Sequence, residues 1–280
     1  MNAGNLSIAQ TLFETTIKSP YNYGVVTQPL TELPVQFHTG SFRSVYSYAT
    51  RGSEEIMADE IAARLGQDPV AFRLATFKKD RQRAVLQRVA DAGGWGKKMA
   101  KGTAQGVGFH EEYEACVADL VEIDTTAKAT IKVYRPDGSP AGSRTVLAPR
   151  VTKATVAVDV GRALNPRGLQ AQMIGGLTDA ISVVFRAGLH INDGAPLEGS
   201  YSEFHYARQK DSPLDVQVIV MPPTGEPGGA GELGLPAAVG AVANAYARAT
   251  GTKPRRFPIN FDIDFPPRPR SLSPQPPFRQ

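Results

Sequence analysis

The chain has 280 residues and a formal net charge of +4, from 31 lysines and arginines against 27 aspartates and glutamates. Its composition, 41% hydrophobic and 21% charged, is that of a globular protein of one large or two medium domains, and it excludes wholesale disorder. So small a charge over the whole chain predicts no nucleic-acid partner. No apolar run reaches the roughly 20 residues of a membrane-spanning helix, so no membrane span is expected.

The single cysteine, Cys116, excludes an internal disulfide framework, an all-cysteine zinc site and a cysteine-held iron–sulfur cluster. The histidines are far apart and show no spacing typical of a zinc site: His38, His110, His190 and His205. The N-terminus has neither the charged leader nor the apolar stretch of an export signal. The sequence therefore favours the cytoplasm, with the periplasm as the alternative if a partner chain carries the signal.

The first hundred residues predict a loop followed by three short helices. Residues 1 to about 40 contain three prolines and no clear periodicity, which suggests that the chain begins partway through a larger architecture. The first helix is predicted over 53–65, with Ser53 as its N-cap. The second begins at Asp68-Pro69, with the aspartate as its cap, and the third covers 81–92 and ends at Gly93-Gly94.

After residue 102 the pattern changes to strands mixed with helices, which predicts an α+β fold. Strands are predicted over 107–112, 115–123, 129–133, 152–159 and 214–221, with a turn at 136–138. Helices are predicted over 165–185, capped by Asn165, and over 237–250. Inside the first of these, Gly175 and Gly176 predict close packing against another backbone. Six prolines between 265 and 280 predict an extended tail.

The glycine-rich run from 228 to 236 (GGAGELGLP) places a carboxylate, Glu232, in a loop between a strand and a helix. Such a loop lets backbone N–H groups approach a ligand, and the following helix N-terminus favours negative charge. Glu232 is then either a general base at the mouth of a pocket or a solvated residue that caps the helix. The run also fits G-x-G-x-x-G, but a proline-rich insert follows the strand and the region 20 residues further on is basic, which disfavours dinucleotide binding.

Two further loops are candidates for ligand binding. The loop from 40 to 45 carries Arg43, whose guanidinium can hold an anion, although a surface arginine with no such role is the commoner case. The loop from 159 to 166 precedes the helix that carries Gln172, and here simple helix capping with an exposed glutamine is an equal alternative.

Taken in order, these loops and their neighbours form a recognisable series. The series is Thr39–Val45 (TGSFRSV), Gly66–Leu74 (GQDPVAFRL), Ala92–Gly96 (AGGWG), Ala157–Pro166 (AVDVGRALNP), Gln172–Gly176 (QMIGG), Gly228–Pro236 (GGAGELGLP) and Ala249–Pro258 (ATGTKPRRFP). It resembles the C-terminal part of the large, molybdenum-binding subunit of the xanthine oxidase family. The branch it is most similar to contains the isoquinoline 1-oxidoreductase β-subunit and related aldehyde oxidoreductases, and the resemblance covers roughly residues 35 to 260.

The resemblance implies an α+β molybdopterin-binding fold of the family type, of which this chain is the C-terminal half. It divides the chain into residues 1–100, a loop and short helices that carry a cofactor-contacting loop; residues 101–262, the α+β molybdopterin-binding domain; and the proline-rich tail, residues 263–280. The implied activity is hydroxylation of an aldehyde or of an N-heteroaromatic ring carbon, with oxygen from water. The implied cofactor is molybdopterin with molybdenum, expected in the cytosine dinucleotide form, and it supplies the redox chemistry.

The resemblance also implies the roles of individual residues. Glu232 matches the catalytic glutamate of the family. The implied cofactor contacts are Gly40, Ser41, Phe42, Arg43, Ser44, Gln172, Gly229, Ala230 and Gly231. No protein side chain is expected to ligate the metal, because the cofactor itself holds it. We further expect the carboxylate of Glu232 to lie away from bulk solvent, with a pterin-sized gap between it and the turn that carries Arg43.

Three departures from the family pattern shape the expected partners. The portion of the large subunit that normally precedes this region is missing, so a second chain is expected to supply the N-terminal half. With one cysteine the chain cannot hold the [2Fe–2S] clusters, so an iron–sulfur subunit is expected, together with a flavin (FAD) or cytochrome subunit in some assemblies. Tyr46 stands where the branch commonly has glycine, so the local substrate space differs. The alternative function is a non-catalytic scaffold subunit derived from such an enzyme.

Overall fold

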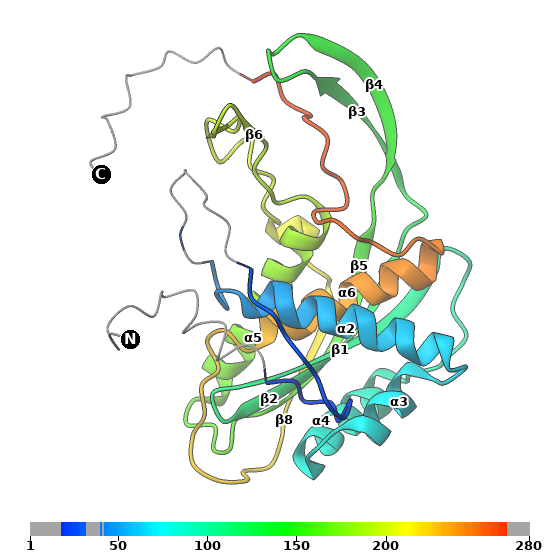
Figure 1. The fold of residues 1–280 in the computed structure, drawn as a ribbon, viewed down its shortest axis with the longest axis vertical. Coiled ribbons are helices and arrows are strands. Elements are labelled where there is room, and N and C mark those ends of the chain that lie inside the picture. The colour runs from blue at the N-terminus through cyan, green and yellow to red at the C-terminus, as the bar shows by residue number, and fades with distance from the viewer. Residues whose placement is uncertain (1–17, 32–39, 41, 268–280) are drawn as a thin grey trace.

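The computed structural model describes residues 18–31, 40 and 42–267. Its centre is a four-stranded sheet in the order β1-β2-β5-β8, formed by β1 (Thr103–Glu112), β2 (Ala115–Asp124), β5 (Arg150–Asp159) and β8 (Asp215–Val220) (Figure 1). The pairs β1–β2 and β2–β5 are antiparallel, whereas β8 joins the edge of β5 in parallel. Two small sheets extend from this centre: the hairpin β3 (Lys128–Tyr134) with β4 (Pro140–Leu147), and β6 (Ile191–Asn192) with β7 (Ala195–Pro196).

Helices cover both faces of the central sheet. One face packs against a layer that contains α2 (Ser47–Arg64), α3 (Pro69–Thr76) and α4 (Asp80–Gly93). The other face packs against α5 (Pro166–Phe185) and α6 (Gly234–Thr250), and a short 3₁₀ helix (Gln209–Asp211) follows the β6–β7 loop. Strand β2 lies between the two layers and is buried from Ala115 to Ile123, which explains its nearly continuous apolar sequence.

Strand β1 and helix α6 are in close contact. Gly106 and Gly108 face the helix, and a Cβ atom at Gly108 would lie 2.1 Å from the carbonyl oxygen of Ala237. The helix is rich in alanine on the same side, and every residue from Gly234 to Tyr246 is buried. Small residues on both elements therefore let α6 approach the sheet, and this approach places the beginning of α6 beside the β1–β2 turn.

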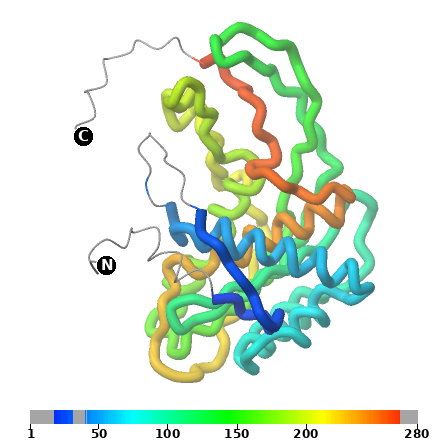
Figure 2. The backbone as a smooth tube through the Cα atoms, viewed as in Figure 1, coloured from blue at the N-terminus to red at the C-terminus, as the bar shows by residue number. Residues whose placement is uncertain are grey.

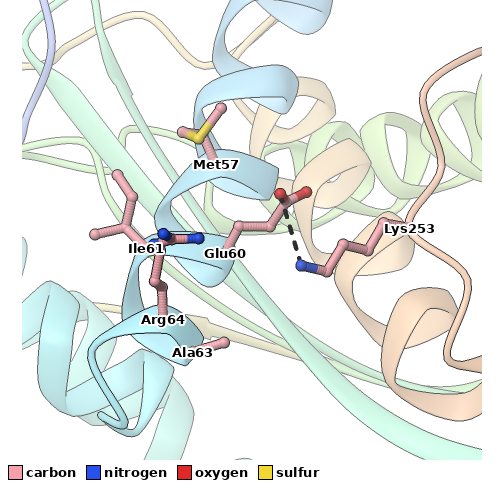
Figure 3. Close-up of a pocket in the computed structure, with 6 residues that line it drawn as sticks. All are labelled: Met57, Glu60, Ile61, Ala63, Arg64 and Lys253. Carbon is pink, nitrogen blue, oxygen red and sulfur yellow. Dashed lines mark ion pairs between the residues drawn. The ribbon is translucent and has the colours of Figure 1, made fainter.

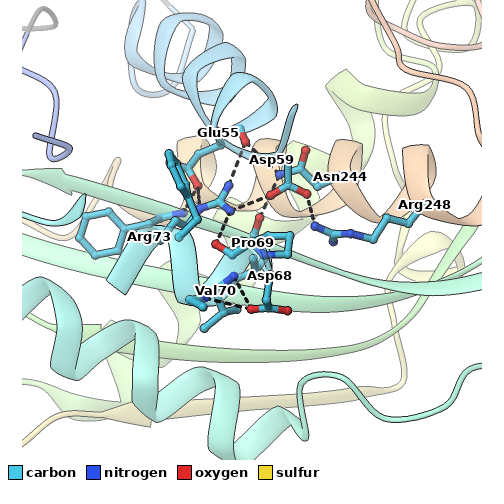
Figure 4. A network of polar contacts seen from close by, with 12 residues as sticks. Glu55, Asp59, Asp68, Pro69, Val70, Arg73, Asn244 and Arg248 are labelled. Carbon is cyan, nitrogen blue, oxygen red and sulfur yellow. Dashed lines mark hydrogen bonds and ion pairs between the residues drawn. The ribbon is translucent and has the colours of Figure 1, made fainter. Parts of the chain in front are cut away.

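A buried network of charged and polar groups joins α2, α3, α6 and β1 (Figure 4). Arg73 donates from Nε to Glu55 Oε2 at 2.9 Å and from Nη1 to Asp59 Oδ1 at 2.6 Å, and its side chain is 0% exposed. Glu55 also accepts from the backbone N–H of Phe109 at 2.9 Å, and Asn244 donates to the Glu55 carbonyl at 3.1 Å. Burial raises the pKa of Glu55, and the Arg73 guanidinium opposes that shift. Each buried charge is thus paired, as a low-dielectric site requires.

Most of the elements predicted from the sequence are confirmed. Asp68 accepts from the N–H groups of Val70 and Ala71 at 2.9 Å, and Asn165 accepts from the N–H of Gly168 at 3.0 Å, so both caps are formed as expected. The turn at 136–138 joins β3 to β4. Gly176 lies against the backbone of α6, since a Cβ atom there would be 2.8 Å from the backbone nitrogen of Leu235.

The first helix was predicted to begin at Ser53, and this is wrong: α2 begins at Ser47, and Ser53 lies in its interior without a capping role. Gly52 stands directly before the predicted start, and glycine usually disfavours a helix interior. Here it lies under Val239 of α6, where a Cβ atom would be 2.5 Å from the valine Cγ1, so packing between helices outweighs propensity.

Other elements also differ from the prediction, and strand β1, for example, begins at Thr103 rather than at residue 107. Helix α6 begins at Gly234, inside the glycine-rich run, rather than at Ala237. Strand β4 was not predicted at all, because its residues are mostly exposed and lack hydrophobic alternation. It forms through backbone pairing with β3. Gly175, unlike Gly176, packs against a side chain, the guanidinium of Arg43, and not against another backbone.

The three-way division of the chain stays a prediction. Within the described residues, α2–α4 and the strands β1 and β2 share one apolar cluster on either side of residue 100. The part of the tail that the structure describes, residues 263–267, runs along the β3–β4 hairpin, where Tyr134 donates its N–H to the Ile263 carbonyl at 2.9 Å. The rest of the tail, residues 268–280, lies outside the described residues, as do most of residues 1–40.

Candidate functional site

The carboxylate of Glu232 is held from two sides. Its Oε1 accepts a hydrogen bond from the backbone N–H of Ser44 at 3.1 Å, and its Oε2 accepts one from the phenol of Tyr113 at 3.1 Å. The Ser44 hydroxyl donates to the Glu232 backbone carbonyl at 2.6 Å. Glu232 is half-buried and lies two residues before α6, whose N-terminal end favours negative charge. The carboxylate is thus held by neighbouring groups at a half-buried position, and its removal from bulk solvent stays a prediction.

Arg43 ties the turn that precedes α2 to two other elements. Its Nε donates to the Gly231 carbonyl at 2.7 Å, and its Nη1 donates to Asp179 Oδ2 on α5 at 2.9 Å. Its Nη2 donates to both the backbone carbonyl and the side-chain Oε1 of Gln172, at 3.0 and 2.7 Å. Gly175 leaves room for this guanidinium, since a Cβ atom there would lie 3.0 Å from Nη1. The planar fork thus fixes the glycine-rich loop against α5.

The N-terminal ends of α2, α5 and α6 consequently lie together at one side of the molecule, on the left in Figure 2. Five residues expected at the cofactor site are joined there by hydrogen bonds: Arg43, Ser44, Gln172, Gly231 and Glu232. These residues are far apart in the sequence, and only the packing of α5 and α6 on the sheet brings them together.

The remaining expected contacts are placed as follows. Gly229 donates its N–H to the Tyr113 carbonyl at 2.8 Å, and Ala230 packs at the edge of the apolar cluster between the sheet and α5. Gly40 has nothing within 4 Å of where a Cβ would be. The Phe42 ring lies edge-on to Tyr48, at a centroid distance of 5.6 Å. Ser41, like His38, lies outside the described residues.

We expected a pterin-sized gap between Glu232 and the turn that carries Arg43, and this expectation is wrong. Ser44 touches the carboxylate directly and Arg43 touches the preceding carbonyl, so no space lies between them. The turn lies directly on the loop because the Arg43 guanidinium bonds to the Gly231 carbonyl, while Ser44 bonds to both the carboxylate and the carbonyl of Glu232. The surface beside Gly231 is open: the residue is exposed, and a Cβ atom there would meet nothing within 4 Å.

Sequence reasoning missed Tyr113, which lies in the two-residue connection between β1 and β2. Burial, followed by the nearby carboxylates of Glu112 and Glu232, raises the pKa of Tyr113 to about 12. Gly228 and Gly229 pack on this connection, since a Cβ atom on either would lie 2.7 Å from its atoms. The spacing of the two strands indicates a hairpin, but nothing local shows that the glycine-rich loop rests on it.

Asp179 and Tyr206 were also missed. Asp179 pairs with Arg43 through one carboxylate oxygen and accepts a hydrogen bond from the Tyr206 phenol through the other. Asp179 stands two helical turns after Gln172 on the same face of α5, so both reach the same arginine. The periodicity of α5 could have indicated this shared face once Gln172 was suspected.

The donors of this site suit an anionic, oxygen-rich group. Neither the N–H of Ala230 nor that of Gly231 takes part in a backbone hydrogen bond with another described residue. Gln172 accepts from Arg43 through Oε1, which leaves its exposed amide nitrogen as a donor on the outer side. With the open space beside Gly231 and the adjacent end of α6, these residues fit the phosphate and pterin oxygens of a molybdopterin cofactor.

Two cavities lie elsewhere. One, of about 390 Å³, is at the opposite end of α2, lined by Met57, Glu60 and Lys253 among others (Figure 3). The other, of about 610 Å³, lies between the β3–β4 hairpin, the end of α5 and the segment that follows β7, and Tyr206 in its lining bonds to Asp179 of the site. Among the described residues, no group of three or more histidine, cysteine or acidic side chains could hold a metal ion. None of the helices that the structure describes has the length and apolar character needed to cross a membrane.

No family profile matches the chain. In sequence it is 29% identical over 212 residues to isoquinoline 1-oxidoreductase subunit beta of Brevundimonas diminuta, covering 74% of this chain and 25% of that relative. It is 26% identical over 246 residues to the membrane-bound aldehyde dehydrogenase (pyrroloquinoline-quinone) of Gluconacetobacter polyoxogenes, covering 80% of this chain and 29% of that relative. In structure it is similar to the aldehyde oxidoreductase of Desulfovibrio gigas, with a TM-score of 0.53 and 15% identity, over 78% of this chain and 40% of the other.

The chain therefore spans less than a third of the length of the curated relatives it matches. Its mixed helix-and-sheet fold is similar to the folds of the aldehyde oxidoreductases among the solved structures, which confirms the predicted α+β fold class. In sequence and in fold, this chain is thus similar to part of the large subunit of the xanthine oxidase family, as its ordered motifs predict.

Proposed function

We propose that this chain is a subunit of a molybdenum hydroxylase that oxidises an aldehyde or an N-heteroaromatic compound with oxygen from water. The observation that carries the proposal is the position of Glu232. Its carboxylate is half-buried at the N-terminal end of α6 and is oriented by the Ser44 N–H and the Tyr113 phenol. A carboxylate held in this way, beside an open space lined by backbone donors, is suited to act as a general base.

The cofactor we propose is molybdopterin in its cytosine dinucleotide form, and when bound it supplies the two-electron oxidation. The residues that would hold it are Gln172 through its free amide nitrogen, the backbone of Gly229, Ala230 and Gly231, and the turn from Gly40 to Ser44. Arg43 has a supporting part in this arrangement. Four of its hydrogen bonds go to other parts of the chain, so it fixes the glycine-rich loop and Gln172 in the positions from which they reach the cofactor.

The chain's own part in the reaction is to accept and release one proton at the carboxylate of Glu232. The Tyr113 phenol and the Ser44 N–H fix the direction of the two oxygens, and the buried Leu233 and Leu235 keep water from the inner side of the loop. We propose that a second chain completes the pocket over Gly231. An iron–sulfur subunit, with a flavin or cytochrome subunit in some assemblies, would then remove the electrons.

The test is the Glu232→Gln variant in the assembled complex. We expect molybdenum and pterin content to equal that of the wild type, and turnover of aldehydes and N-heteroaromatic compounds to fall by about 10²–10⁴-fold. Glu226→Gln, on an exposed part of the same loop, is the matched control. Full turnover by Glu232→Gln would refute the assignment, and a folded complex without molybdenum would favour the scaffold alternative.

A further inference from the structure

The connection between β1 and β2 has an unusual backbone. Tyr113 and Glu114 both have positive φ angles, 53° and 57°, in a two-residue hairpin turn. This conformation favours asparagine and glycine, because other side chains are crowded there. A tyrosine and a glutamate at these positions carry a conformational cost, which a structure keeps only where the surroundings impose it.

The same kind of backbone occurs on the other side of Glu232. Ser44 and Val45 also have positive φ angles, 65° and 45°. Among the described residues other than glycine, these four and Asp193 are the ones with positive φ. Four of the five thus belong to the two turns whose groups contact the Glu232 carboxylate. Strained backbone is concentrated around this one side chain.

The glycine-rich loop holds the Tyr113 side chain in place. The Gly229 N–H donates to the Tyr113 carbonyl at 2.8 Å, and a Cβ atom at Gly229 would lie 2.7 Å from the tyrosine Cβ. The ring therefore leaves the turn along the surface of the loop and ends with its hydroxyl 3.1 Å from Glu232 Oε2. The residue is 54% exposed, so the ring also forms part of the open surface beside the loop.

The charges around Tyr113 keep its phenol in the donor form. Glu112 on β1 and Glu232 on the loop are both acidic, and with burial they place the pKa of Tyr113 at about 12. His110 pairs with Glu112 at 3.0 Å, and on the α4 side Arg81 donates to the Glu114 carbonyl at 2.9 Å. A phenol that stays protonated around neutral pH offers its hydrogen bond to a neighbouring carboxylate.

We propose that Tyr113 is a positioning residue that orients the carboxylate of Glu232 for its role as the proton acceptor. The inference rests on the proposed function, in which Glu232 is the base. The Ser44 N–H fixes one oxygen and the Tyr113 phenol fixes the other, so that both oxygens have a set direction. The strained turn is retained because it is the feature that brings a phenol to this point.

The experiment uses Tyr113→Phe in the assembled, molybdenum-loaded complex, with Tyr201→Phe, a 93% exposed tyrosine, as the control. We expect kcat to fall about tenfold with KM unchanged, because the lost hydrogen bond orients the base and does not bind the substrate. The control should keep the wild-type kcat, and an unchanged kcat in Tyr113→Phe would overturn the inference.

A second measurement needs no turnover. Urea unfolding of the chain is followed for Tyr113→Phe in the wild-type and in the Glu232→Ala background. We expect the lower midpoint caused by Tyr113→Phe in the wild type to be absent when Glu232 is alanine, because the lost hydrogen bond is the one between them. An equal decrease in both backgrounds would overturn the inference. Full activity of Glu232→Gln would instead refute the proposed function, and the unfolding result would still report on the contact.

Discussion

Arg43 donates a hydrogen bond of 2.7 Å from its Nε to the carbonyl oxygen of Gly231, although 188 positions of the chain separate the two residues. The same guanidinium also bonds to Gln172 and Asp179. One side chain therefore connects the turn before α2, helix α5 and the loop before α6. The position of Glu232, the next residue after Gly231, depends on this connection.

The first prediction concerns the geometry of that guanidinium. Arg43→Lys keeps the charge but loses the planar fork, so one ammonium group can replace only part of the bonds to Gly231, Gln172 and Asp179. We expect the free energy of unfolding to decrease by about 1–2 kcal/mol, since hydrogen bonds to charged groups are lost. Urea unfolding measures this change. Arg88→Lys, at an exposed position on α4, is the control and should leave the midpoint unchanged.

The second prediction concerns a buried acid that the proposed site does not use. Asp119 lies in the middle of β2 with 1% of its surface exposed, and its Oδ2 has no hydrogen-bond partner among the described residues. Burial raises the pKa of Asp119 well above its usual range. The folded state then holds this proton more tightly than the unfolded state, so the stability present at acid pH is lost as the pH rises above the ordinary aspartate pKa.

Replacing this aspartate should therefore stabilise the protein at neutral pH. For Asp119→Val we expect the free energy of unfolding at pH 7 to increase by about 1–3 kcal/mol, the usual cost of a buried polar group without a partner. The slope of stability against pH should also flatten. Asp119→Asn is the matched variant, because it removes the ionisation but keeps a buried polar group, so it should flatten the slope with a smaller gain. An unchanged slope in both variants would contradict this account.

The third prediction tests the contact between β1 and α6. Gly108→Ala would place a Cβ atom 2.1 Å from the Ala237 carbonyl oxygen, which forces the first turn of α6 away from the sheet. Overpacking of this kind decreases stability by about 1–3 kcal/mol. Gly225→Ala, where a Cβ atom meets nothing within 4 Å, is the control and should have little effect. Thermal unfolding of both variants separates a tight contact from a general effect of alanine.

Signals that act within a few residues were sufficient to predict much of this fold. The caps at Asp68 and Asn165 form hydrogen bonds to N–H groups two and three residues further on, so the sequence shows both partners at once. Strand β2 is apolar because it is buried on both faces, and this also appears directly in its composition. Strand β4 could not be predicted in the same way, because its stability comes from pairing with β3 and not from its own side chains.

By itself, the sequence determined the α+β class, most helices and strands, the glycine-rich loop that carries Glu232, and the similarity to the xanthine oxidase family. Only the tertiary structure decided that Arg43 donates its hydrogen bonds to other parts of this chain and that Ser44 and Tyr113 hold the Glu232 carboxylate. It also decided that no gap lies between this carboxylate and the turn that carries Arg43. The reason is how far apart in the sequence the contacting residues are. Caps and periodicity join residues within a turn or two, whereas the contacts of Glu232 join residues 119 and 188 positions apart, and these depend on how α5 and α6 pack against the sheet.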